Sequence, residues 1–223
     1  MAHKKRTYRY IKPPKGWVRF EVIVQETDLS VSALKPLEKR TRELILQARG
    51  TIEAYIRQFP RFAQTLLPWV INGPTPPIIR AMAAAGKNAG VGPMAAVAGM
   101  VAETVGKGLL VDSPEVIVEN GGDIFICLSQ PVTVGILATH SPDNLKLGIR
   151  INPGAQPRGI CTSSGTMGHS LSLGTADAVT VISNSCPLAD ATATAVANRC
   201  VPGTARILKG EPSTVGVRCL TSP

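Results

Sequence analysis

The stretch that decides the fold is DAVTVISNSCPLADATATA, residues 177–195. Its first part predicts a strand over 178–183, because it is a short apolar run of strand length. A turn follows, and a helix is predicted over 187–198. On that helix Asp190 and Thr194 lie four positions apart and therefore project from one face. The stretch thus predicts a strand followed by a helix that presents a carboxylate and a hydroxyl on the same side.

A carboxylate and a hydroxyl on one helix face can together bind a hard cation such as Mg²⁺. The alanines around Asp190 and Thr194 keep that face open to a ligand. A structural interpretation stands beside this one. In it, Asp190 favours the N-terminus of its helix electrostatically, and Thr194 is an ordinary hydroxyl at the edge of the core. The residues alone leave both interpretations open.

Hydrophobic periodicity predicts further elements on both sides of this stretch. Towards the N-terminus, strands over 17–26 and 29–33 are joined by a turn at Thr27-Asp28. A helix over 36–59 follows. Two alanine-rich helices are predicted over 78–87 and 93–109, and the other expected strands cover 116–118, 124–128, 132–139, 145–151 and 159–163, with one more at 205–208 or 215–220.

Strands gathered in the second half of the chain around a pair of alanine-rich helices predict a layered α+β domain. A chain of 223 residues is long enough to bury one sizeable core. Aromatic residues make up only 4% of it, so glycine and alanine carry much of the close packing. We expect residues 1–16 to form a basic tail and residues 17–223 to form the single domain.

Charge is unevenly distributed along the chain. Residues 1–61 hold 14 Lys and Arg against six Asp and Glu, whereas the other 162 residues hold 10 against nine. A basic segment of this kind favours binding to nucleic acid or to another anionic partner. No helix-turn-helix or zinc-finger spacing follows it, so a solvated tail and helix face are favoured over a nucleic-acid site.

The sequence also excludes several classes of protein. It has no run of about 18 apolar residues, which excludes an ordinary membrane-spanning helix. Its basic start lacks the apolar region of a secretory signal, so we expect a cytoplasmic protein. Five widely spaced cysteines without a CxxC pair favour reduced thiols over a disulfide scaffold or a zinc site. Neither a GxSxG elbow nor a Walker loop occurs.

The segment Asn120-Gly121-Gly122-Asp123 lies between two predicted strands. One interpretation is a tight hairpin turn, for which Asn-Gly is a strong signal. The other is a nucleotide contact, because glycines let backbone amides approach a phosphate closely. Gly121, Gly122 and Asp123 are therefore candidate cofactor-binding residues.

A polar loop over residues 161–170, CTSSGTMGHS, is dense in hydroxyl groups and holds one of the three histidines of the chain. His169 suits acid–base chemistry or a ribose contact, and a histidine satisfied within its own loop is the structural alternative. Ser163 and Ser164 are candidate catalytic residues that would orient an acceptor or a phosphate. Gly165 and Thr166 are candidates for contact with a cofactor.

The stretch over residues 177–195 resembles the C-terminal metal-binding motif of the ApbE-like superfamily of Mg²⁺-dependent flavin transferases. Residues 120–124 are similar to the glycine-glycine-aspartate segment of that family. The resemblance implies a mostly antiparallel sheet packed against alanine-rich helices. It implies that Asp190 and Thr194 bind Mg²⁺ and that FAD or FMN is the ligand. It also implies a main-chain carbonyl ligand from the small-residue helix, at Ala95 or Ala96.

One part of the pattern of that family is missing. There the histidine is followed by aspartate-proline-x-threonine-glycine, whereas His169 is followed by SLSLG, residues 170–174. Two hypotheses remain: a Mg²⁺-dependent transferase of a flavin phosphate or nucleotidyl group, and a non-catalytic flavin- or nucleotide-binding protein on the same scaffold. A third, weaker hypothesis is a module that binds an anionic partner through its basic N-terminus. The oligomeric state stays open, and a homodimer is compatible with the sequence.

Overall fold

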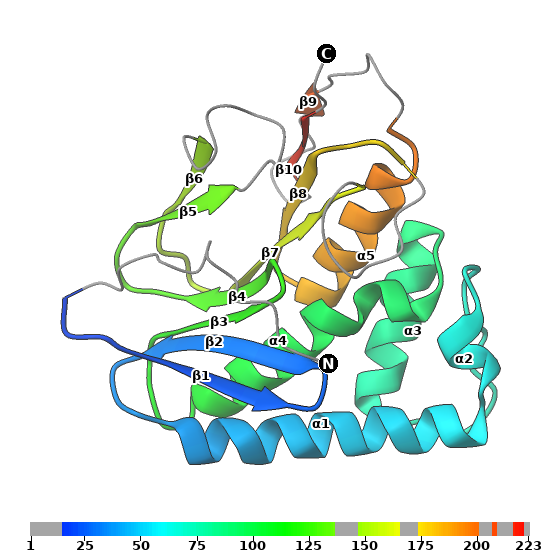
Figure 1. Ribbon diagram of the computed structural model, residues 1–223, viewed down its shortest axis with the longest axis horizontal. Helices are drawn as coiled ribbons and strands as arrows, with labels where there is room; N and C mark the ends of the chain where they lie inside the picture. Colours follow the sequence, from blue (N-terminus) through cyan, green and yellow to red (C-terminus); the bar gives the residue numbers. More distant parts are fainter. Residues whose placement is uncertain (1–14, 137–146, 166–173, 201–206, 209–215, 221–223) are drawn as a thin grey trace.

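The computed structural model describes residues 15–136, 147–165, 174–200, 207–208 and 216–220. Within them, eight strands form one antiparallel sheet in the order β1-β2-β3-β4-β7-β8-β10-β9, and β5 pairs with β6 in a second sheet (Figure 1). The strands are β1 (Val18–Val24), β2 (Thr27–Ala33), β3 (Val116–Asn120), β4 (Asp123–Cys127), β5 (Val132–Ile136), β6 (Leu147–Ile151), β7 (Arg158–Ser163), β8 (Ala178–Ser183), β9 (Ile207–Leu208) and β10 (Gly216–Leu220).

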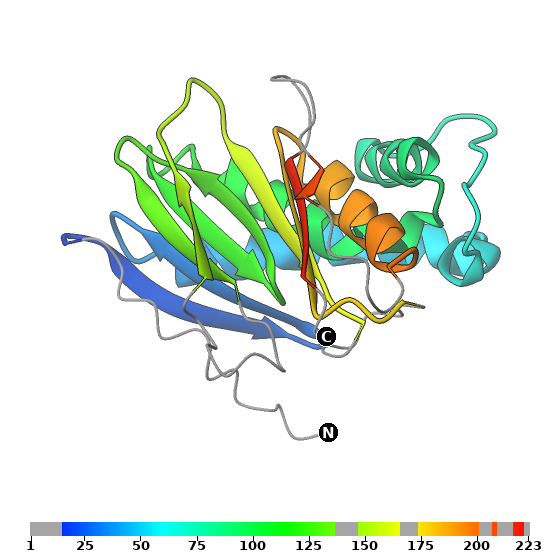
Figure 2. The same ribbon diagram turned by 90° about the horizontal axis from the view of Figure 1, so that it is seen from above.

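Helices cover one face of the large sheet, as Figure 2 shows from above. They are α1 (Glu38–Gln58), α2 (Arg61–Gln64), α3 (Pro77–Ala89), the 3₁₀ turn η2 (Pro93–Ala96), α4 (Val97–Leu109) and α5 (Cys186–Ala197). α1 packs on β1 and α4, and α4 packs on β3 and β4. α5 packs on β7 and β8 and also contacts α3 and α4. The helix that carries Asp190 therefore lies between the sheet and two other helices.

Alanines let α5 occupy this central position. Its five alanines from Ala189 to Ala197 are all buried, although they alternate along the sequence and so point in different directions around the helix. Burial on all sides requires neighbouring backbones to come close, which small side chains permit. Polar groups on α5 are consequently held inside the molecule rather than on its surface.

The opposite face of the large sheet carries a smaller apolar cluster. It joins Ile126 and Ile160 of the sheet to Val134 and Ile151 of the β5–β6 hairpin. The hairpin thus shields the face that the helices leave uncovered. The main core, between the sheet and the helices, is separate from this cluster.

The predicted fold class is confirmed: the molecule is α+β, with an antiparallel sheet packed against alanine-rich helices. The predicted turn at Thr27-Asp28 is wrong, because Thr27 already pairs with Val24 in the β1–β2 ladder. The turn consists of Gln25 and Glu26, with a φ of 53° at Gln25. Arg49 of α1 contacts Glu26 and donates a hydrogen bond to the Thr27 hydroxyl at 2.9 Å, and so holds the turn from outside the hairpin.

Two other expectations differ in detail from the structure. The helix expected over 93–109 begins as the 3₁₀ turn η2 before α4 starts at Val97. Near the C-terminus one strand was expected at either of two places, and strands form at both. No single helix among the described residues has the length and hydropathy to cross a membrane; α3 and the η2–α4 segment meet that test only as a pair bent by 106°.

Candidate functional site

Asp190 is held in place by the start of α5. Ser185 is the N-cap residue, and its hydroxyl accepts a hydrogen bond from the backbone N–H of Leu188 at 3.5 Å. Pro187 stands in the first turn, where its missing N–H costs nothing. One turn further on, Asp190 is buried, with 7% of its surface exposed.

The carboxylate of Asp190 contacts the first turn of α4. The backbone N–H of Gly99 donates to Asp190 Oδ2 at 2.8 Å. N–H groups in a first helical turn have no partner within the helix, so Asp190 caps α4 from a different element. A Cβ on residue 99 would lie 2.6 Å from the carbonyl oxygen of Cys186 and 2.9 Å from the Cβ of Asp190. Only glycine allows α4 and α5 to approach this closely.

The same part of α4 is held from the sheet. Asn120, the last residue of β3, donates from Nδ2 to the carbonyl oxygen of Ala98 at 3.1 Å. The backbone that faces Asp190 is therefore that of Ala98 and Gly99. It lies two or more residues beyond Ala95 and Ala96, where the sequence led us to expect a carbonyl ligand.

Glu103 joins α4 to the start of α5. It is buried, and its Oε2 accepts the backbone N–H of Cys186 at 2.7 Å. Its Oε1 pairs with Lys107 Nζ at 2.5 Å. A carboxylate next to a helix N-terminus is favoured by the helix dipole. Glu103 and Gly99 therefore fix α5 against α4 at two points one turn apart, at Cys186 and at Asp190 itself.

A second buried carboxylate belongs to Asp123, which begins β4 directly after the Gly121-Gly122 turn. Burial raises the pKa of Asp123 to about 7. The thiol of Cys161 opposes this increase by hydrogen bonding, the charge of Glu119 adds to it, and a backbone hydrogen bond from Thr162 opposes it. Asp123 thus changes its charge near neutral pH rather than near pH 4.

The two aspartates affect one another. Burial raises the pKa of Asp190 well above its usual range, and the charge of Asp123 raises it further. Hydrogen bonds from the backbone of Gly99 and Ala98 act in the opposite direction. Two carboxylates in one buried region repel each other unless a proton or a cation compensates their charge. Either a proton or a cation would therefore compensate the negative charge of this region.

Thr194, one turn after Asp190 on α5, contacts the last residue of β7. Its hydroxyl and that of Ser163 are 3.2 Å apart and share a hydrogen bond. Both side chains are half-buried, and Ser164, the next residue, is half-buried as well. The structure thus brings together Thr194, a predicted metal ligand, and Ser163, a predicted catalytic residue. His169 and Thr166, two further predicted site residues, lie outside the described residues.

The glycines predicted to contact a cofactor have structural roles within the protein. Gly121 and Gly122 form a two-residue turn with φ values of 68° and 111°, which glycine adopts without strain. The N–H of Gly122 donates to Glu119 Oε1 at 3.1 Å. A Cβ on Gly165 would lie 2.1 Å from the carbonyl oxygen of Gly174. Each position requires glycine for internal reasons, and contact with a cofactor stays a prediction.

The side chains near the two aspartates limit which metal ions the region could bind. Cys161 and Cys186 lie beside the aspartates, but burial raises the pKa of both thiols well above the usual range, so they stay protonated. Among the described residues, no cluster of three or more His, Cys, Asp or Glu side chains could hold a metal. A cation here would combine the carboxylate of Asp190 with hydroxyl, backbone or ligand oxygens. These are hard donors, which fit Mg²⁺.

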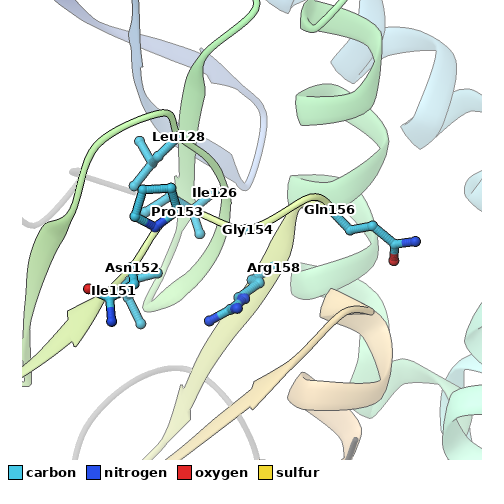
Figure 3. Close-up of a pocket in the computed structure, with 8 residues that line it drawn as sticks. All are labelled: Ile126, Leu128, Ile151, Asn152, Pro153, Gly154, Gln156 and Arg158. Carbon is cyan, nitrogen blue, oxygen red and sulfur yellow. The ribbon is translucent and has the colours of Figure 1, made fainter.

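Two hollows in the described surface lie away from these aspartates. One is lined by Ile126, Ile151, Asn152 and Arg158 beside the β5–β6 hairpin, and Figure 3 shows Gln156 at its edge, pointing away from the rest. The other lies between α1 and the segment over residues 72–76. Neither is lined by Asp123 or Asp190. The buried aspartates, and neither of these two hollows, therefore mark the candidate site.

Three residues of this region were not identified from the sequence: Asn120, Gly99 and Glu103. Glu103 offers a signal, because it is the only acidic residue in the long apolar segment over 77–109. For Asn120 the sequence predicts a role in the hairpin turn and gives no sign of its contact with Ala98. Gly99 cannot be distinguished from the other glycines of its helix without knowing where α5 packs.

Comparisons with known proteins agree with this architecture. The model of the family described as AbpE bacteria matches residues 9–214. A UPF0280 protein of Methanocaldococcus jannaschii is 40% identical over 185 residues, which is 82% of this chain and 75% of that protein. A UPF0280 protein of Methanospirillum hungatei is 45% identical over 183 residues, 81% of this chain and 75% of that protein.

Two solved structures share the fold. The flavin transferase ApbE of Vibrio cholerae, as the H257G mutant, superposes with a TM-score of 0.57 at 14% identity, covering 91% of this chain and 97% of that one. The flavinyl transferase ApbE of Pseudomonas stutzeri in its apo form gives a TM-score of 0.52 at 15% identity, covering 81% and 83%. At these identities the likeness concerns the fold alone.

Proposed function

The chain belongs to the family described as AbpE bacteria, and from that premise we propose that it is a Mg²⁺-dependent protein that binds a flavin or other nucleotide and transfers a flavin phosphate or nucleotidyl group. The fold is that of flavin transferases, which supports a flavin-related function. A cytoplasmic location and FAD or FMN as ligand are parts of the same proposal.

The observation that carries the proposal is the buried pair Asp123 and Asp190. Placing two carboxylates in one buried region is unfavourable, and a bound cation removes most of that cost. In the proposed site Asp190 and Thr194 hold the metal, and Asp123 adds negative charge nearby. When bound, Mg²⁺ supplies positive charge that neutralises a diphosphate as it is cleaved.

The other predicted site residues would have separate tasks. Ser163 and Ser164 orient the phosphate or the acceptor, and His169 takes the proton of the acceptor. In the transfer, the acceptor oxygen bonds to the phosphorus on the FMN side of FAD, the P–O bond to the AMP phosphate breaks, and AMP leaves. Burial of Asp190 between α4 and α5 keeps its carboxylate in one orientation for this work.

A second candidate function is flavin or nucleotide binding without transfer. The specific observation in its favour is the sequence SLSLG at residues 170–174, where the resemblance leads us to expect an aspartate. Loss of that carboxylate removes a candidate acid–base or metal-binding group and leaves Asp190 and Thr194 unchanged. Binding and catalysis are therefore separable in this protein.

Calorimetric titration with FAD, with and without Mg²⁺, tests the binding step. We expect FAD to bind in a Mg²⁺-dependent manner, and Asp190→Asn to weaken that binding by at least tenfold, because a charged ligand group contributes on the order of 1.5–3 kcal/mol. The control is Asp112→Asn, which removes a half-buried aspartate that approaches Arg40 at 3.9 Å. Mg²⁺-independent binding, or equal binding by both variants, would contradict the metal assignment.

Product analysis separates the two candidate functions. A transferase incubated with FAD, Mg²⁺ and an acceptor releases AMP, and FMN becomes attached to the acceptor or, with water as the acceptor, is released. A binding protein leaves FAD intact even when titration shows tight, Mg²⁺-dependent binding. The Asp190→Asn variant distinguishes true turnover from a contaminating phosphatase, because only true turnover is lost with it.

A further inference from the structure

One peptide unit, the Ala98–Gly99 amide at the start of α4, is held from both sides. Its carbonyl oxygen accepts a hydrogen bond from Asn120 Nδ2 at 3.1 Å. Its N–H donates to Asp190 Oδ2 at 2.8 Å. The three groups belong to β3, α4 and α5, which are far apart in the sequence. A continuous chain of hydrogen bonds therefore runs from the sheet through α4 to the carboxylate.

Planarity of the amide couples the two ends of this chain. The carbonyl and the N–H of one trans peptide lie in one plane and point in opposite directions, so a group that fixes the carbonyl also fixes the direction of the N–H. A hydrogen bond to one end of an amide also polarises the other end, which strengthens the bond that its N–H donates. Asn120 thus acts on Asp190 without touching it.

The start of α4 needs such support. Its N-cap residue, Ala96, makes no side-chain cap hydrogen bond, and the 3₁₀ turn η2 leads directly into it. A first helical turn without a cap frays, because its N–H groups have no partners within the helix. Asp190 of α5 supplies the cap instead, by accepting the hydrogen bond of the Gly99 N–H. Asn120 holds the peptide that carries this N–H.

We propose that Asn120 is a positioning residue that, through the Ala98–Gly99 peptide, holds Oδ2 of Asp190 on α4 and so fixes the orientation in which this carboxylate meets the ligand of the site. The second part of this proposal, the effect of Asn120 on metal binding, rests on the function proposed above. The first part, the control of the Gly99–Asp190 hydrogen bond by Asn120, holds with or without metal. The two parts can therefore be tested separately.

The test uses Asn120→Asp, which keeps the shape of the side chain and replaces its N–H donor with an acceptor that repels the Ala98 carbonyl. Asn120→Ala is the second variant, in case a buried charge prevents folding. Asn88 is exposed on α3, so Asn88→Asp and Asn88→Ala are matched controls. Two quantities are measured in the full chain: hydrogen exchange of the Gly99 amide in metal-free protein by NMR, and the Mg²⁺ dissociation constant by calorimetry.

In the Asn120 variants we expect Gly99 exchange to be faster by about fivefold or more and Mg²⁺ binding to be weaker by about three- to tenfold, the range that loss of one hydrogen bond produces. The Asn88 variants should leave both unchanged. Unchanged Gly99 exchange in the Asn120 variants would overturn the proposal. Faster exchange with unchanged Mg²⁺ affinity would reduce Asn120 to a structural role and also overturn it. If the parent protein binds no Mg²⁺, the proposed function is refuted. The exchange rate of the Gly99 amide then tests only whether Asn120 controls the Gly99–Asp190 hydrogen bond.

Discussion

Asp123 and Asp190 place two acidic groups where the protein has little water to solvate their charge. Asp190 accepts hydrogen bonds from α4, and Asp123 accepts them from the Cys161 thiol and the Thr162 backbone. Those bonds favour the charged forms, but burial outweighs them, so the pKa of each carboxyl is raised. At this scale the site is a pair of carboxyl groups whose negative charge is only partly neutralised by protonation at neutral pH.

The raised pKa of Asp123 predicts how stability depends on pH. The folded protein holds the proton of Asp123 up to about pH 7, whereas the unfolded chain releases it near 3.8, so ionisation favours unfolding and stability falls as pH rises between these values. Asp123→Asn removes this dependence, and in EDTA we expect the variant to gain on the parent by up to roughly 4 kcal/mol between pH 4 and pH 8.

Urea denaturation of both proteins across this pH range measures the effect. The Asp112→Asn variant, which removes a half-buried aspartate beside Arg40, serves as the control. A constant difference in the free energy of unfolding between Asp123→Asn and the parent at all pH values would show that Asp123 titrates normally.

At the scale of elements, the site depends on how closely α4 and α5 approach. Their backbones meet at Gly99 and Cys186, and Glu103 bonds the first N–H of α5. Because Asp190 lies one turn beyond Cys186 on α5 and itself bonds Gly99, any change in the spacing of the helices also moves its carboxylate. The alanines of α5 and the glycine of α4 are thus as important for the site as the side chains that carry charge.

Gly99→Ala tests this dependence. Its Cβ would meet backbone atoms at 2.6 Å, which cannot move without separating the helices, so we expect a loss of about 1–3 kcal/mol in unfolding free energy. Gly50→Ala in α1 is the matched control, because its Cβ meets nothing within 4 Å and alanine is the better helix former; it should stabilise by about 0.5–1 kcal/mol. Thermal or urea denaturation gives the sign of both changes, and equal effects of the two variants would refute the account.

Elements were predictable from sequence where one local signal dominated. The strand β8 was placed at its observed bounds, and the hairpin turn predicted from Asn120-Gly121 forms one residue later, at Gly121-Gly122, where both φ values are positive. The first hairpin turn was misplaced by two residues, because Arg49 of a distant helix stabilises Gln25 and Glu26 there. The contact of Asn120 with Ala98 was equally hidden, since it depends on which helix packs beneath β3.

Across the whole molecule, the large sheet separates two regions of different character. One face carries the helices and the buried aspartates, and the other carries the β5–β6 hairpin and an apolar cluster. β7 contributes to both, because Ser163 meets Thr194 on the helix side while Ile160 packs in the apolar cluster. The buried aspartates of the proposed site thus lie on the helix side of the sheet.

Removing residues 1–16 tests whether the basic tail takes part in this chemistry. If the domain is residues 17–223, the shortened protein should keep its thermal transition within a few degrees and bind FAD and Mg²⁺ as the full chain does. Salt-sensitive binding to RNA or DNA that disappears with the tail would instead support the anionic-partner hypothesis. Loss of flavin binding would show that the tail belongs to the site.

The most direct measurement of the central claim is a crystal structure of the protein soaked with FAD and Mn²⁺, in which Mn²⁺ replaces Mg²⁺ and is located by its anomalous scattering. The account predicts one Mn²⁺ within about 2.4 Å of a carboxylate oxygen of Asp190 and of the Thr194 hydroxyl, with the FAD diphosphate against it. An Asp190 carboxylate that bonds only to α4, with the Mn²⁺ elsewhere or absent, would contradict the account and leave Asp190 as a helix cap.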